Sequence, residues 1–281
     1  MNAKKQLVLM IILLGGIMVL FQGGGSEDGQ NYSIVKNIDS QSVNYYGEPS
    51  ALWIFNDTDA LQYLQRLLKI PAADKAYYLA VQYLIPNRDR GGYSRGGSAD
   101  SAAYTSAVHR IAQIIGNKPV IVIIEPDELY FEDPDYELMK IAVKVYRQKC
   151  RNAKIFIDAG NPAWLAPKEV VKRLRKAGIH FADGFSVNVS SFYPTQTCIQ
   201  YADSIIQSFI GKKYLIDTSR NGGRSPRYPD IYDPEGIKIG ISPSFHTKNP
   251  NCLAFLWIKP PGESDGRVAP AGTFIKSLVG M

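Results

Sequence analysis

Short apolar runs alternate with amphipathic stretches of helical spacing from about residue 40 to the end of the chain. The runs are rich in Val, Ile, Leu and Tyr, which is typical of buried strands. They predict strands at residues 77–85, 120–124, 155–157, 184–189, 214–216 and 253–258. The stretches between them predict helices at residues 58–70, 98–115, 135–150 and 167–177. This alternation predicts a one-domain α/β fold whose parallel sheet forms either a barrel or an open doubly wound sheet.

A polar side chain follows nearly every predicted strand. These residues are Asp89, Glu125, Asp127, Asp158, Asn188, Asp217, Glu263 and Asp265. In a (β/α) barrel the carboxyl ends of the strands converge on one mouth, so these side chains would surround a single cleft. Alternatively, each could end a strand as a turn former or cap the following helix. That alternative accounts for single positions better than for the whole set, which favours the barrel.

Several common classes of site lack their motifs in this sequence. There is no GxGxxG or GxxxxGK motif for a nucleotide. Three histidines and three cysteines lie far apart, without the spacing of a zinc site. Lys and Arg outnumber Asp and Glu by 32 to 26 without forming a basic block, so we expect no nucleic-acid partner.

A cleft with many acids, few histidines and several aromatic residues suits carbohydrate chemistry. Cleaving a glycosidic bond requires one protonated carboxyl group and a second group that activates water or attacks the sugar. The acid needs a raised pKa, which a neighbouring carboxylate or an apolar pocket provides. Glu125 and Asp127, at the end of the apolar run 120–124, are both candidates for this acid, and chemistry alone does not separate them.

Five motifs resemble those of glycoside hydrolase family 6, in the family's order, from about residue 43 to the C-terminus. The motifs are Tyr83-Leu-Ile-Pro-Asn-Arg-Asp89 with Gly91-Gly-Tyr-Ser94, Ile124-Glu-Pro-Asp127, Asp158-Ala-Gly160 with Trp164, Asp217-Thr-Ser-Arg-Asn-Gly222 and Trp257-Ile-Lys-Pro-Pro-Gly-Glu-Ser-Asp-Gly266. The family contains cellulose-cleaving endoglucanases and cellobiohydrolases. The resemblance implies a distorted (β/α) barrel of the TIM-like type with about seven parallel strands.

The resemblance also implies a catalytic role for each of five residues. Asp127 matches the family's general acid, and Asp89 matches the acid that keeps the proton on it. Asp265 matches the candidate base. Tyr83 matches the tyrosine that contacts the distorted sugar, and Ser94 matches the serine that holds the attacking water. Glu125, the other candidate for the acid, would then brace the end of its strand.

Further positions match residues that bind the substrate. Trp164 matches a platform that stacks on a glucose ring, and Lys259 and Glu263 match ligands of sugar hydroxyls. We add Asn188, in the predicted strand 184–189, and Trp257, the first residue of the last motif, as substrate-binding candidates. The implied reaction is inverting hydrolysis of a β-1,4-glucan, which needs a gap of about 6.5–9.5 Å between acid and base. It needs no metal and no organic cofactor.

The sequence departs from the family pattern at several positions. Arg90 stands where the family usually has a cysteine, so that disulfide is absent, and an odd number of cysteines leaves at least one thiol unpaired. Asn161 and Pro167 stand where the family often has His and a second Trp, which implies weaker subsites. Residues 267–281 leave little room for a tunnel roof. We therefore expect internal cleavage in an open cleft; the alternative is a membrane-tethered glucan-binding or cellulose-remodelling protein with weak or no turnover.

The first 30 residues differ from the rest of the chain. Lys4 and Lys5 precede an apolar run at residues 7–21, and Gly, Ser and acidic residues follow it. This pattern predicts a secretory signal peptide, because the run is shorter than the roughly 20 residues of a membrane-spanning helix. The alternative is an uncleaved membrane anchor, since no small-x-small cleavage pattern stands out. We expect a single catalytic domain at residues 31–281 that is monomeric and secreted, or else anchored outside the cytosol.

Overall fold

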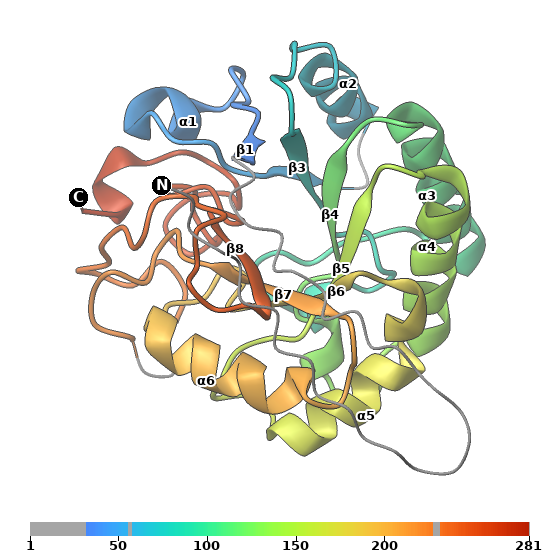
Figure 1. Ribbon diagram of the computed structural model, residues 1–281. Helices are drawn as coiled ribbons and strands as arrows, with labels where there is room; N and C mark the ends of the chain where they lie inside the picture. The colour runs from blue at the N-terminus through green and yellow to red at the C-terminus, as the bar shows by residue number, and fades with distance from the viewer. Residues whose placement is uncertain (1–31, 56–57, 227–230, 281) are drawn as a thin grey trace, which may run out of the picture. The chain divides into compact units, whose positions relative to one another are not determined.

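The computed structural model describes residues 32–55, 58–226 and 231–280 (Figure 1). Contacts divide the chain after Gln30, and all the described residues belong to the second unit, Asn31–Met281. The predicted signal peptide or anchor, residues 1–30, lies outside the described residues. Among the described helices, none combines the length and the apolar character that crossing a bilayer requires.

Seven parallel strands form a curled sheet in the order of the chain. They are β2 (Leu52–Ile54), β3 (Ala76–Gln82), β4 (Val120–Ile124), β5 (Lys154–Asp158), β6 (Gly184–Val187), β7 (Lys213–Asp217) and β8 (Cys252–Leu256). A two-residue strand, β1 (Ser33–Ile34), pairs with the start of β3. Neighbouring strands are consecutive in sequence, whereas the strand order of a doubly wound sheet reverses. The predicted distorted barrel of the TIM-like type is therefore confirmed.

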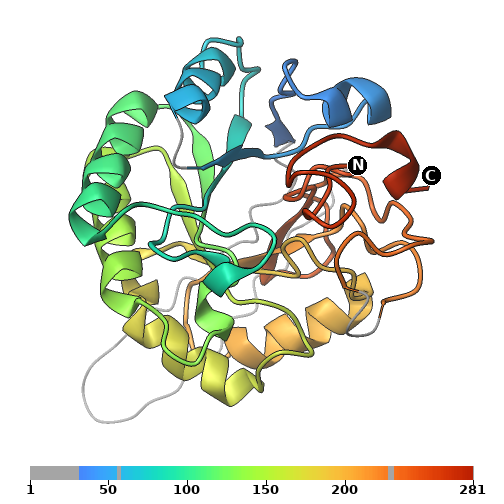
Figure 2. The same cartoon turned by 180° about the vertical axis from the view of Figure 1, so that it is seen from behind.

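Helices surround this sheet (Figures 1 and 2). The α-helices are α1 (Gln41–Tyr46), α2 (Thr58–Leu67), α3 (Ser101–Ile115), α4 (Tyr136–Lys149), α5 (Pro167–Lys176) and α6 (Thr195–Ile206), and the short 3-10 helices are η1 (Asp89–Gly91), η2 (Glu128–Tyr130), η3 (Ile179–Phe181) and η4 (Lys276–Leu278). Sequence signals predict α2 to α5. Asp100, for example, accepts a hydrogen bond from Ala103 N at the start of α3, and Pro167 opens α5. The helices α1 and α6 and the strands β1 and β2 were not predicted from the sequence.

Alternate side chains of the strands face two different apolar layers. In β3, Leu79 and Val81 belong to the cluster inside the barrel. Tyr78 and Ala80 belong to the larger cluster that the strands share with the helices. Because the strands are buried on both faces, their sequences are continuously apolar rather than alternating.

The two edges of the curled sheet meet where β2 and the residue before it lie beside the residues that follow β8. Ala51 N donates to Trp257 O at 3.0 Å, and Trp53 Nε1 donates to Ile258 O at 2.8 Å. Within the described residues no ladder joins β2 to β8, so these two bonds link the edges in its place. The barrel is thus closed by a few contacts at the same end where the polar residues gather.

The three cysteines of the chain are buried and free. They are Cys150, Cys198 and Cys252. Burial raises the pKa of Cys150 to about 11 and that of Cys252 to about 12, so both are protonated at neutral pH. The expected unpaired thiol is confirmed, and the other two cysteines are also without a disulfide.

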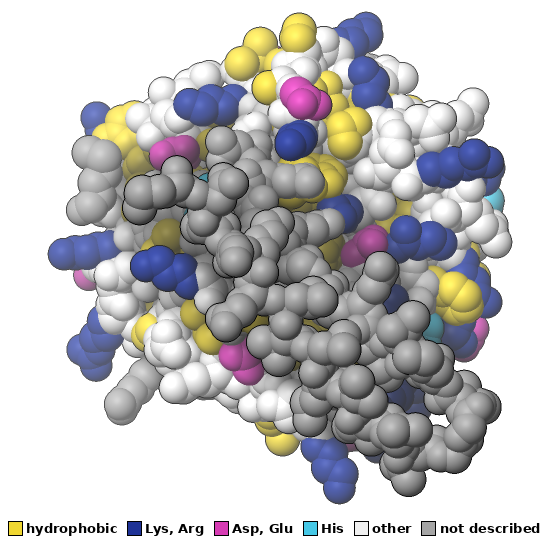
Figure 3. Space-filling model, viewed as in Figure 1, with side chains coloured by type: hydrophobic (Ala, Val, Ile, Leu, Met, Phe, Trp, Pro, Cys, Tyr) yellow, Lys and Arg dark blue, Asp and Glu magenta, His cyan; other side chains and the backbone are white. Residues whose placement is uncertain are grey.

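The basic side chains are spread over the surface rather than collected. On the face seen in Figure 3, Lys and Arg side chains lie apart from one another across the coloured parts. Some pair with acids of their own helix, as Arg173 does with Glu169 at 2.9 Å and Lys140 with Glu137 at 2.7 Å. The formal charge of +6 therefore builds no single basic patch on this visible face.

Candidate active site

One pocket opens where the strands of the barrel end. It is lined by Trp53, Phe55, Tyr83, Ser94, Asp127, Ser190, Lys259, Glu263, Asp265, Ala271 and Gly272. Six of these were predicted from the sequence as site residues, and they come from three of the five motifs: Tyr83, Ser94, Asp127, Lys259, Glu263 and Asp265. Carboxyl groups, a lysine and aromatic rings thus meet in one small space.

Asp127 stands just beyond β4 in a left-handed backbone conformation, with φ of 70°. Its backbone N donates to Asp158 Oδ2 at 3.2 Å, and its own Oδ2 accepts a hydrogen bond from Tyr83 Oη at 3.2 Å. Burial, followed by the charges of Asp158 and Asp89, raises the pKa of Asp127 to about 8. This carboxyl group therefore holds its proton at neutral pH, as a general acid must.

Asp89 lies in the loop after β3 and acts on the pocket through its charge. Its Oδ2 accepts a hydrogen bond from Ser94 N at 2.7 Å, which fixes the loop on which Ser94 reaches the pocket. A Cβ on Gly92 would lie 2.4 Å from the same oxygen, so this turn requires glycine. Burial raises the pKa of Asp89, and when ionised it raises the pKa of Asp127.

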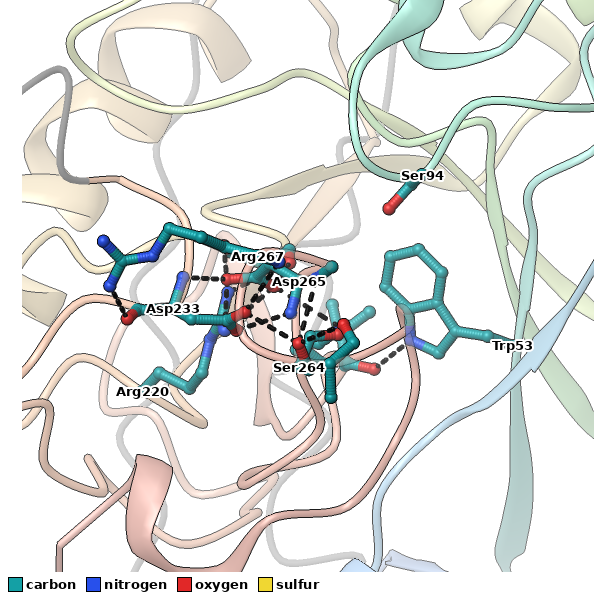
Figure 4. A network of polar contacts seen from close by, with 12 residues as sticks. Trp53, Ser94, Arg220, Asp233, Ser264, Asp265 and Arg267 are labelled. Atoms are coloured by element: carbon teal, nitrogen blue, oxygen red, sulfur yellow. Dashed lines mark hydrogen bonds and ion pairs between the residues drawn. The ribbon is translucent and has the colours of Figure 1, made fainter.

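Asp265 lies beside positive charges, whereas Asp127 lies beside other acids (Figure 4). Its two oxygens lie 3.0 Å and 2.9 Å from Arg220 Nη1, and its Oδ1 lies 3.5 Å from Lys259 Nζ. Burial alone would raise the pKa of Asp265, but Arg220 and then Lys259 hold it below its usual value. Asp265 is therefore ionised at any pH at which Asp127 is titrated.

Glu263 and Lys259 line the pocket from the segment that follows β8. Burial raises the pKa of Glu263 to about 7, although Lys259 and Arg220 act against this shift. Lys259 Nζ donates to Ser264 O at 3.2 Å and lies 5.7 Å from the centre of the Trp53 ring. Groups that donate and accept hydrogen bonds thus lie beside an aromatic face, an arrangement suited to a sugar ring.

Glu125, the other acid beyond β4, is absent from the pocket lining. Its Oε2 accepts from Leu84 N at 2.9 Å and Ile85 N at 3.0 Å, and its Oε1 accepts from Gln82 Nε2 at 2.6 Å. These bonds replace the next rungs of the ladder, which is why the strand predicted at 77–85 ends at Gln82. Glu125 braces the ends of β3 and β4.

Three of the five substrate-binding candidates lie outside the pocket lining, and two of these three are buried. Asn188 has no exposed surface, and its Nδ2 donates to Tyr193 O at 3.2 Å and Asp217 O at 2.9 Å. Trp257 is 2% exposed, donates from Nε1 to Ile241 O at 3.0 Å and packs with its edge against another ring. Neither side chain lines the pocket, because each already satisfies groups of the fold.

Trp164 lies outside the lining of the pocket but remains partly exposed. A Cβ on Gly160, whose φ is 73°, would lie 2.7 Å from its ring, so the indole lies directly over this glycine. The ring centre of Trp164 is 4.6 Å from that of Tyr130. Together the two rings form an aromatic platform at the carboxyl end of β5.

Five residues of the pocket were not predicted. They are Trp53, Phe55, Ser190, Ala271 and Gly272. Each lies outside the five motifs, and Trp53 belongs to a strand too short for a periodic signal. Within the described ranges, no three His, Cys, Asp or Glu side chains converge as a metal site.

Buried carboxyl groups make the stability depend on pH. Burial raises the pKa of four of them, to about 8 for Asp127 and to about 7 for Glu125, Asp158 and Glu263. The same groups titrate near pH 4 in an unfolded chain, so between pH 5 and 8 the native state binds more protons. The free energy of unfolding therefore falls as pH rises through this window. We expect calorimetry to give a Tm at least about 3 °C lower at pH 8 than at pH 5; an equal or higher Tm at pH 8 would contradict this.

Comparison with known proteins gives one family. The model of Glycosyl hydrolases family 6 matches residues 35–276. Endoglucanase A of Thermobispora bispora is 36% identical over 242 residues, which are 81% of this chain and 53% of that protein. Endoglucanase A of Cellulomonas fimi is 36% identical over 226 residues, which are 78% of this chain and 49% of that protein. The chain thus spans about half the length of these two curated relatives.

Solved structures agree with the sequence relatives. Endoglucanase Cel6 from Mycobacterium tuberculosis, in complex with methyl-cellobiosyl-4-deoxy-4-thio-β-D-cellobioside, is 32% identical and has a TM-score of 0.77. The similarity covers 84% of this chain and 86% of that one. The motifs, the barrel and these comparisons agree, and the chain belongs to glycosyl hydrolases family 6.

Proposed function

We propose that the protein hydrolyses β-1,4-glucosidic bonds in cellulose or a related β-glucan. One observation carries this proposal: two carboxyl groups of a single pocket have pKa values displaced in opposite directions. The pKa of Asp127 is raised to about 8, and that of Asp265 is lowered. A protonated acid and an ionised carboxylate facing one cavity are what glycosidic cleavage requires.

Asp127 is the proposed general acid. Its proton passes to the glycosidic oxygen as the bond to the leaving sugar breaks, and the carboxylate that remains is stabilised by Tyr83 Oη at 3.2 Å. Asp89 and Asp158 keep the proton on Asp127 beforehand, because their charges disfavour its ionisation. Tyr83, whose ring lines the pocket, contacts the sugar that is distorted.

Asp265 is the proposed base, and the reaction is proposed to invert the anomeric centre. Its lowered pKa makes it a weak base towards free water. Water becomes acidic as its oxygen bonds to the anomeric carbon, however, so a weak base suffices once attack has begun. Ser94, which lines the same pocket, holds that water, and Lys259 and Glu263 bind sugar hydroxyls.

The finer features of this function rest on the sequence and on the named relatives. The two sequence relatives are named endoglucanases, which supports internal cleavage in an open cleft. We further propose that residues 31–281 are one catalytic domain. Residues 1–30 are proposed to be a signal peptide or a membrane anchor, which places the domain outside the cytosol.

Hydrolysis of cellohexaose, followed by NMR of the anomers and by chromatography, tests the proposal. We expect the α-anomer to be formed first, and products of internal cleavage to dominate. Formation of the β-anomer first would reject inversion, and release of cellobiose alone from one end would reject internal cleavage. Binding without release of reducing ends would favour a glucan-binding protein.

Replacing Trp164 by Ala should weaken substrate binding. Loss of the aromatic platform is expected to raise KM for cellohexaose by about tenfold, which corresponds to about 1.4 kcal/mol, with kcat within about twofold. Initial rates over a range of cellohexaose concentrations give both constants. Tyr63→Ala, at an exposed aromatic residue of α2, is the control and should leave KM unchanged. Equal KM values in both variants would show that Trp164 binds no sugar.

A further inference from the structure

The segment from Ser264 to Val268 carries Asp265 but belongs to no strand or helix. Four of its N–H and O–H groups donate to one carboxylate, that of Asp233, which is 4% exposed. Asp233 Oδ1 accepts from Asp265 N. Asp233 Oδ2 accepts from Ser264 Oγ at 2.7 Å, Arg267 N at 3.0 Å and Val268 N at 3.1 Å (Figure 4). The shape of this segment therefore depends on a residue 32 positions earlier in the chain.

Asp233 also contacts the carboxylate of Asp265 itself. Asp233 N donates to Asp265 Oδ2 at 3.2 Å, on the oxygen that Arg220 Nη1 approaches to 2.9 Å. Arg267 Nη2 in turn donates to Asp233 O at 2.7 Å. One residue thus fixes both the backbone that carries Asp265 and the direction in which its carboxylate points.

The backbone of Asp233 is in the left-handed region, with φ of 44°. L residues other than Asn and Asp rarely adopt this conformation. A buried residue that keeps it is held there by its surroundings, and such residues cluster at functional sites. The conformation turns both the carboxylate and the N–H of Asp233 towards the segment 264–268.

We propose that Asp233 is a positioning residue for the reaction, which holds Asp265 in the orientation needed to accept a proton from the attacking water. This inference rests on the proposed function. A misplacement of about 1 Å in a reacting group costs on the order of a hundredfold in rate. Loss of the contacts of Asp233 should therefore lower kcat. KM should change little, because the sugar-binding groups elsewhere in the pocket are intact.

Asp233→Asn tests this role, because asparagine has the same shape and the same backbone tolerance but replaces one acceptor oxygen with an NH₂ group. We expect kcat for cellohexaose to fall about 10- to 100-fold, with KM within about twofold. In an Asp265→Asn background the same change should cost nothing further, because Asp233 acts through Asp265. Ser264→Ala removes one of the four contacts to Asp233, together with the hydrogen bonds of the same hydroxyl to Ala269 O and Gly266 N, and should give a smaller loss of the same kind if Asp233→Asn fails to fold.

Asp183→Asn is the matched control. Asp183 also accepts from a backbone N–H, that of Ile155 at 2.8 Å, and from Arg147 Nη2 at 2.7 Å, but it precedes β6 at the opposite end of the barrel. This variant should lower the Tm without changing kcat. Unchanged kcat in Asp233→Asn, or a loss that adds fully to that of Asp265→Asn, would overturn the positioning role. Absence of turnover in the wild-type protein would overturn the proposed function and this inference with it.

Discussion

Replacing Asp127 by Ala is expected to lower kcat for cello-oligosaccharides about 1,000-fold or more, because it removes the proposed proton donor. The fold should survive this change. The raised pKa of Asp127, about 8, means that its ionised form is disfavoured in the native state, so its loss removes an unfavourable group. Reducing-end assays measure the rate, and circular dichroism with a thermal scan checks the fold.

The leaving group distinguishes loss of the acid from a general loss of the site. An aryl cellobioside with an acidic phenol needs little protonation as its bond breaks, so Asp127→Ala should slow it only about tenfold. Asp265→Asn should slow hydrolysis of cellohexaose and of the aryl cellobioside to a similar extent, since the Asp265 carboxylate acts on the attacking water and not on the leaving group. Turnover of cellohexaose by Asp127→Ala at the wild-type rate would reject the assignment of the acid.

Replacing Glu125 by Ala is expected to destabilise the protein by about 3 kcal/mol or more. The change leaves the N–H groups of Leu84 and Ile85 and the amide of Gln82 without their acceptor, and each buried unsatisfied group costs about 1–3 kcal/mol. For a chain of this size the Tm should fall by about 6–12 °C. Differential scanning calorimetry at pH 6 gives the value.

Two further variants sharpen this test. Glu125→Gln keeps an acceptor oxygen and resembles the protonated form that a pKa of about 7 implies at pH 6, so it should cost only about 1 kcal/mol. Glu137→Ala, at a side chain of α4 that is 76% exposed, should leave the Tm within about 1 °C. If Glu125→Ala had the same Tm as the wild-type protein, the hydrogen bonds of Glu125 would not stabilise the ends of β3 and β4.

The choice between Glu125 and Asp127 shows where sequence reasoning stopped. Both follow the same buried strand, and the alternation of an extended strand would place them on the same face. In the structure both adopt left-handed backbone, with φ of 46° and 70°. The carboxyl group of Glu125 turns back to the end of β3, whereas that of Asp127 enters the pocket. Two local turns decide this. Chemistry alone left the choice of acid open, and only the resemblance to the family favoured Asp127.

Asn188 and Trp257 show the same limit for binding residues. Their residue types and their positions in or after predicted strands suggested contact with sugar. In the structure both are buried and donate hydrogen bonds to Asp217 O and Ile241 O. Conversely, Trp53 lines the pocket from a strand of three residues, which has no pattern of its own. That strand exists because β3 pairs with it.

The sequence by itself determined the alternation of parallel strands and helices and favoured a barrel, because hydrophobic period and composition can be read along the chain without knowing its fold. Apolar runs buried on both faces specify parallel strands, capping residues start the helices, and acids after the strands specify the end that carries chemistry. Only the tertiary structure decided which acid keeps its proton and which loses it. Those pKa values depend on burial and on charges brought close from distant segments, as Arg220 is brought to Asp265 across 45 residues and Asp158 to Asp127 across 31. Coulomb interactions act through distance in space, which the order of residues does not state.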